Sequence, residues 1–259
     1  MHDFLLQWEI LWPALLSGLL VLATHVPLGQ AVLQRGIIFL DLAIAQIAAF
    51  GLVIATTLGV GEHAAHTEWL QQGIAVTAAV SGAMLLYQLR RFSAGVQEAL
   101  IGILFILAAT GSILLLAQDP HGGERLKDML VGQILWVQVQ DLFGVALLYA
   151  VVLAIWFGLR ERSGDWVFYP LFAVTITFST QLVGVYLVFA SLIIPALATR
   201  GQRHALRSAY LLGGCGYLLG LVLSALLDLP AGAAIAWCLA GAALVWFVGC
   251  FGEPLPDQE

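Results

Sequence analysis

The residues of this sequence that could do chemistry are polar side chains inside long apolar runs, because a charged group in hydrocarbon is costly. His25 lies in the first run, and Asp41 and Gln46 lie in the second. His25 is ten residues before the turn at Arg35 and Gln46 eleven after it, so both would lie about 15 Å from that turn. Across adjacent helices, an imidazole nitrogen and an amide oxygen, completed by water or Asp41, could hold a divalent ion in transit. The structural alternative is a histidine bonded to backbone freed by Pro27.

The spacing in the second run limits what Asp41 can contribute. Five helical steps place Asp41 and Gln46 roughly 140° apart, so they form no compact pair on an undistorted helix. Asp41 would lie only about 9 Å from the level of Arg35, where it could gate ions, pair with Arg35 or cap a helix. A mixed set of nitrogen and oxygen ligands predicts weak binding that decreases at low pH, because ligation requires the deprotonated histidine ring.

A second candidate for metal binding is the pair His63 and His66. The HxxH spacing can place two imidazoles on one face of a helix, and Glu62 and Glu68 flank the pair. The loop has no Lys or Arg and is predicted to be external. It is a possible capture site for a metal ion, and the alternative is a solvated polar connection.

Long apolar runs must position these residues. Of the 259 residues, 61% are hydrophobic and 10% are charged, whereas soluble domains carry about 25% charged residues. The sequence therefore predicts an all-α, polytopic helical bundle of eight or nine membrane segments in contact with lipid, forming one transmembrane domain over 1–259. Runs of spanning length fall at about 10–31, 37–60, 71–89, 96–117, 141–159, 207–227 and 232–251.

The segment 166–199 differs from these runs. It is too long for one ordinary span and too short for two spans with a full loop. Gly184 and Pro195 lie within it, so the sequence predicts a broken or re-entrant pair of helices. Membranes tolerate such a break where the freed backbone is buried in protein or faces a wet cavity.

The distribution of Lys and Arg predicts the orientation. With the N-terminus outside and two passes within 166–199, Arg35, Arg90 and the bases of 200–207 lie in the cytoplasm. The bases of 119–128 are the exception, because that segment would be external. The ten bases are scattered and form no basic stripe, which argues against nucleic-acid binding.

Sequence motifs for catalysis are absent. The chain has no GxxxxGK[ST] motif, so it cannot be its own ATPase, and no GxSxG or HExxH motif indicates a hydrolase. The three cysteines lack the spacing of metal ligands or redox pairs. We therefore expect a protein that is not an enzyme and holds no tightly bound cofactor.

Five stretches carry a resemblance to a known family, and together they cover most of the chain. They are PLGQAVLQRGIIFLDLAIAQIAAFG (27–51), EALIGILF (98–105), RLKDMLVGQILWVQVQDL (125–142), LVGVYLVFASLIIPALATR (182–200) and LDLPAG (227–232). In order and spacing, they resemble the permeases of the zinc, manganese and iron ABC importers. The resemblance implies a homodimer or pseudo-dimer of permeases, two cytoplasmic ATPase subunits and an extracytoplasmic metal-binding protein.

Two departures from the family pattern are evident. The family's second helix has an Asp followed four residues later by a His, and that His position falls on Gln46 here, with Asp41 five residues before it. The family's cytoplasmic coupling segment between its fifth and sixth spans is reduced to RERSGDW (160–166). The short link predicts weak ATP-dependent activity.

The leading interpretation is a multi-pass permease subunit of a bacterial inner-membrane ABC transporter for zinc or manganese, working by alternating access. The first alternative is a non-transporting permease-like protein that has lost the metal pair and the coupling segment. The second is a carrier driven by an ion gradient, which needs no ATPase.

Overall fold

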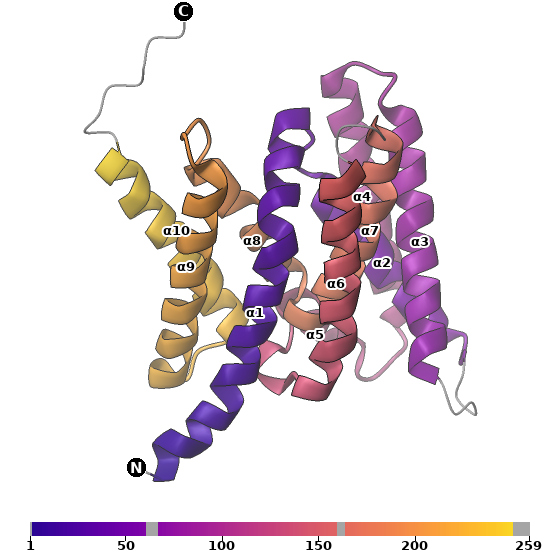
Figure 1. The fold of residues 1–259 in the computed structure, drawn as a ribbon. Coiled ribbons are helices and arrows are strands. Elements are labelled where there is room, and N and C mark those ends of the chain that lie inside the picture. Colours follow the sequence, from indigo (N-terminus) through magenta and orange to yellow (C-terminus); the bar gives the residue numbers. More distant parts are fainter. Residues whose placement is uncertain (1, 61–66, 160–163, 251–259) are drawn as a thin grey trace, which may run out of the picture.

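Helices form nearly all of the described chain. The computed structural model describes residues 2–60, 67–159 and 164–250, and within these ranges there is no strand (Figure 1). The helices are α1 (His2–Arg35), α2 (Leu40–Thr57), α3 (Thr67–Leu89), α4 (Ala94–Leu116), α5 (Gly122–Val131), the 3-10 turn η1 (Ile134–Trp136), α6 (Val139–Leu159), α7 (Gly164–Val183), α8 (Val185–Ala198), α9 (Ala205–Leu227) and α10 (Ala231–Cys250).

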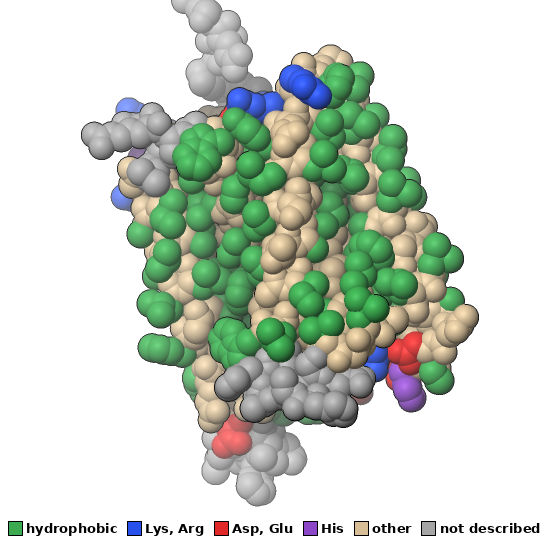
Figure 2. All heavy atoms as spheres, turned by 90° about the vertical axis from the view of Figure 1, so that its right-hand side faces the viewer, with side chains coloured by type: hydrophobic (Ala, Val, Ile, Leu, Met, Phe, Trp, Pro, Cys, Tyr) green, Lys and Arg blue, Asp and Glu red, His purple; other side chains and the backbone are tan. Residues whose placement is uncertain are grey.

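Eight of the described helices are long and apolar enough to cross a membrane, and α8 is a shorter apolar helix. Figure 2 shows the corresponding surface: charged side chains gather toward the two ends of this face, and a broad uncharged band lies between them. The predicted all-α bundle of eight or nine membrane segments is confirmed.

The predicted break within 166–199 occurs at Gly184. Its amide donates to the Thr180 carbonyl at 2.9 Å, and its own carbonyl accepts from the Val188 amide at 3.1 Å. Gly184 has φ 81°, which an L side chain rarely adopts. Pro195 lies inside α8 and causes no break. The segment is thus two helices, α7 and α8, that meet at a glycine.

The contact of α8 with α1 shows the direction of α8. A Cβ at Gly29, near the end of α1, would lie 2.0 Å from the Leu192 carbonyl oxygen in α8. The C-terminal parts of α1 and α8 therefore lie at the same end of the bundle. We call this the arginine end, because Arg35 and Arg90 lie there with the connection that follows α8. The expectation that 166–199 makes two passes is consistent with this arrangement.

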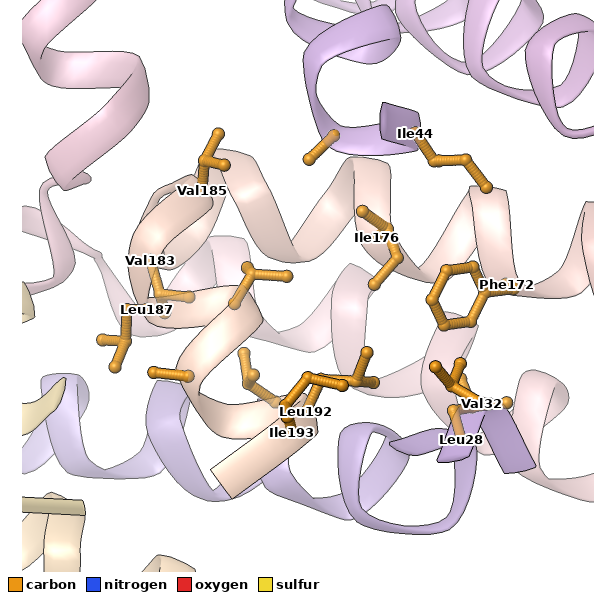
Figure 3. Packing of buried hydrophobic residues seen from close by; sticks show 14 of the residues in the cluster. Leu28, Val32, Ile44, Phe172, Ile176, Val183, Val185, Leu187, Leu192 and Ile193 are labelled. Atoms are coloured by element: carbon orange, nitrogen blue, oxygen red, sulfur yellow. The ribbon is translucent and has the colours of Figure 1, made fainter. Parts of the chain in front are cut away.

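The hairpin of α7 and α8 lies between α1 and α2. Helix α1 packs mainly on α8 and α9, whereas α2 packs on α3, α4, α7 and α8. In Figure 3, Ile44 of α2 lies on one side of Phe172 and Ile176 of α7, and Leu28 and Val32 of α1 lie on the other. The core of the bundle is therefore built around this hairpin.

Candidate functional site

His25 is fully buried on the face of α1 that meets α8 and α9. Its Nδ1 lies 2.9 Å from the Val21 carbonyl oxygen, which can only accept, so Nδ1 carries the proton. Nε2 then bears the free lone pair, and it is buried without a hydrogen-bond partner. A histidine fixed in this way by a backbone carbonyl presents the nitrogen that binds metals.

The structural alternative for His25, a hydrogen bond to the backbone freed by Pro27, is not found. Pro27 has no amide hydrogen, and the carbonyl that this frees, one turn earlier, belongs to Ala23. That oxygen accepts a hydrogen bond of 2.9 Å from the Tyr210 hydroxyl of α9. The carbonyl that Pro27 frees is therefore bonded by Tyr210, and His25 takes no part in this hydrogen bond.

Asp41 is buried in the first turn of α2, with 1% of its surface exposed. Neither carboxylate oxygen has a hydrogen-bond partner. Of the alternatives open for Asp41, the two structural ones are not found: Arg35 binds Asp165, and no side-chain cap bond is made at the start of α2. A buried carboxylate without a partner is costly, and this cost favours a functional role for Asp41.

Gln46 is also buried, with 4% of its surface exposed. The structure does not bring Gln46 and His25 together across adjacent helices, because α1 and α2 are separated by the α7–α8 hairpin. Among the described residues, no group of three or more His, Cys, Asp or Glu side chains could hold a metal ion. His25, Asp41 and Gln46 are therefore separate buried polar positions and do not form one compact site.

The candidate capture residues His63 and His66 lie outside the described residues, as does Glu62.

One carboxylate at the arginine end joins three helices. Asp165, at the start of α7, accepts from Arg35 of α1 at 3.0 and 3.1 Å and from Arg90, the residue directly after α3, at 3.0 Å. The Arg35 guanidinium also lies 4.2 Å from the centre of the Phe168 ring. This contact adds a cation–π interaction. We call Asp165, Arg35 and Arg90 the charge cluster.

Aromatic residues extend the charge cluster toward α4. Arg90 donates to the Tyr87 hydroxyl at 3.0 Å, the Tyr87 and Tyr169 rings meet edge to face, and Gln97 of α4 donates to the Tyr169 hydroxyl at 3.3 Å. Sequence reasoning missed this cluster. The signal was an acid three residues after Arg162, at the end that the arginines had already marked.

A comparison with known families agrees with this architecture. The profile of the ABC 3 transport family matches residues 7–163 and 154–249. The chain is 24% identical over 258 residues to the high-affinity zinc uptake system membrane protein ZnuB of Haemophilus influenzae, covering 90% of this chain and 95% of that protein.

A solved structure has a similar fold. It is PsaBC from Streptococcus pneumoniae in complex with Fab, with a TM-score of 0.75 and 20% sequence identity. The match covers 95% of this chain and 94% of the chain in that structure.

Proposed function

Because this chain belongs to the ABC 3 transport family, we propose that it is the membrane-spanning permease subunit of a bacterial ABC transporter for zinc or manganese. The observation that carries the proposal is the pair of buried polar groups without partners, His25 Nε2 and the Asp41 carboxylate. Imidazole and carboxylate are suitable ligands for borderline divalent ions such as zinc and manganese. Groups that must bind and release an ion are expected to lack permanent protein partners.

The partners follow from the family. We propose that two copies of the chain assemble with a cytoplasmic ATPase and an extracytoplasmic metal-binding protein in the bacterial inner membrane. The arginine end is then cytoplasmic, which agrees with the preference of Arg and Lys for that side. The charge cluster would hold α1, α3 and α7 together where the ATPase acts.

The α7–α8 hairpin is our candidate for the moving element. It separates α1, which carries His25, from α2, which carries Asp41 and Gln46. Broken helices near the middle of the membrane line the ion sites of many transporters. In this proposal, the hairpin shifts twice. One shift opens a path past Asp41 and Gln46 and the next opens a path past His25, so the ion meets these residues in succession.

The proposed function is tested by ATP-dependent uptake. The chain, reconstituted in vesicles with its cognate ATPase and metal-binding protein, should accumulate radioactive zinc or manganese only when ATP is present on the ATPase side. Because the link 160–166 is short, we expect slow metal-stimulated ATP hydrolysis. Robust hydrolysis would contradict that expectation. Uptake without ATP would support the gradient-driven alternative, and no uptake of either metal would support the non-transporting one.

A second prediction concerns His25. His25→Leu should reduce the metal bound per purified chain at least about tenfold, because it removes the free Nε2. The melting temperature should fall only slightly, because the apolar replacement loses the Nδ1 hydrogen bond to the Val21 carbonyl, worth about 1 kcal/mol, and Nε2 has no partner to lose. Both quantities can be measured on the same preparation, by elemental analysis and by thermal unfolding.

The matched control is Ser17→Ala. Ser17 lies on the same helix, is also buried, and its hydroxyl oxygen is also without a partner. This variant should keep the parent's metal content. If His25→Leu keeps its metal as well, or merely unfolds the protein, His25 is structural and has no part in the path.

A further inference from the structure

A cavity of about 340 Å³ opens between α2, α5, α7 and α8, on the side of the bundle away from the arginine end. Its polar lining comes from Asp128, Gln133, Thr180 and Gln181. The wall on the α2 side is apolar and consists of Ala48, Ala49 and Leu52. The cavity thus brings one carboxylate, two amides and one hydroxyl to a common hollow.

The oxygen atoms of this cavity are available to a ligand. Asp128 forms no ion pair with any described residue, and the nearby base Arg125 is bound to Asp119 at 3.1 Å. The Thr180 hydroxyl donates to the Ile176 carbonyl at 2.9 Å, so the lone pairs of its oxygen are free. Carboxylate, amide and hydroxyl oxygens are the ligands of hard and borderline divalent cations.

A second cavity meets the first at the same carboxylate. It has about 230 Å³, and its lining includes Asp128, Gln133 and the connection 229–232 between α9 and α10. Asp128 therefore lies where two hollows adjoin, and its side chain is exposed. A cation at Asp128 could keep part of its water shell, because both hollows are much larger than one water at about 30 Å³.

The cavity lies over the stripe of α2 that carries Asp41. Ala48 and Leu52 are seven and eleven residues after Asp41, which places each of them within about 20° of Asp41 around the helix. Ala48 is about 10 Å farther from the arginine end than Asp41. Between these levels, Ile44 and Ile176 are fully buried and fill the space with apolar side chains (Figure 3).

We propose that this cavity is an outer docking site, in which Asp128 binds a partly hydrated divalent cation before the cation passes the apolar barrier toward Asp41. The proposal rests on the proposed transport function. A single carboxylate with neutral oxygen ligands gives weak binding, as a transport site that must release its ion requires. The site selects for charge and for oxygen ligation, and leaves finer discrimination to deeper groups.

The test uses Asp128→Asn in the reconstituted transporter, with Mn²⁺ as the probe. The Mn²⁺ concentration for half-maximal uptake should rise about tenfold, while the maximal rate stays near that of the parent. Asp128→Glu should restore most of the affinity. Glu124→Gln is the matched control, because Glu124 is an exposed acid on the same helix that lies outside the lining of both cavities, and its kinetics should equal the parent's.

Direct binding separates this proposal from the proposed function. Electron paramagnetic resonance of the purified chain should show a weak Mn²⁺ site that Asp128→Asn removes and Glu124→Gln keeps, whether or not the chain transports. Normal uptake with no change in half-saturation or in Mn²⁺ binding for Asp128→Asn would overturn the docking site and leave the transport function intact. If Asp128→Asn lacks the Mn²⁺ signal that the parent shows, but the parent takes up no metal, the docking site is supported and the transport function is overturned.

Discussion

Asp41→Asn should abolish metal uptake and leave the folded protein as stable as the parent or more so. The carboxylate is buried and neither oxygen has a partner, so its removal breaks no hydrogen bond. The neutral amide removes any charge from a buried position, so the free energy of unfolding should equal the parent's or exceed it. Uptake should nevertheless decrease at least about 100-fold, because the ion loses the carboxylate on the α2 side of its path.

Uptake and melting temperature must be measured on the same variant, since a functional carboxylate is identified by a loss of uptake without a loss of stability. Asp141→Asn is the control. Asp141 also lies in the first turn of a helix, α6, but it is exposed, and both properties should stay at the parent's level. A lower melting temperature for Asp41→Asn, or uptake at the parent's rate, would show that the carboxylate is not part of the ion path.

Gly184→Ala should have the largest effect on folding. A Cβ at Gly184 would lie 2.3 Å from the Gly132 nitrogen and 2.5 Å from the Val131 carbonyl carbon, and φ is 81°. These neighbours are backbone atoms that cannot rotate away, so the α7–α8 hairpin would have to separate from the segment after α5. We expect a loss of more than about 4 kcal/mol, which is exceptional for one substitution.

Size-exclusion profiles and melting temperatures in detergent measure this loss. Gly214→Ala is the control, because Gly214 is inside α9 and an added Cβ would meet nothing within 4 Å. It should be neutral or stabilise the helix by about 0.5–1 kcal/mol. If Gly184→Ala behaves like Gly214→Ala, the close approach of the two glycines is not needed for the fold.

The sequence was sufficient for the membrane-spanning helices and for the break in 166–199, although it did not predict α5 or η1. Apolar runs of spanning length are a local property, and so is a glycine within a segment too long for one span. The neighbours of α1 could not be predicted in the same way. Gly18 and Gly29 are complementary in shape to Tyr217 of α9 and Leu192 of α8, and no local pattern shows which distant surface will match a small residue.

For the candidate residues too, local properties could be predicted from the sequence and contacts between distant segments could not. Distance to the nearest turn gave the depth of His25 and Asp41 along their helices, but it could not show that protein surrounds their side chains, as it does in the structure. Their partners could not be found from it. Proximity in sequence made Asp41 one possible partner of Arg35, but Arg35 binds Asp165, 130 residues later. Pairing of charges depends on which helix ends meet, and this is decided by the packing of the whole bundle.

The packing of α1 has a consequence for biosynthesis. Its main partners, α8 and α9, and the Asp165 that binds Arg35, are made long after α1 itself. At about 5–20 residues per second, a ribosome needs roughly 10 seconds or more to go from Arg35 to α8. During that time the buried histidine of α1 has no final environment. Helix α1 is therefore made early but reaches its native contacts late, after α9 has emerged.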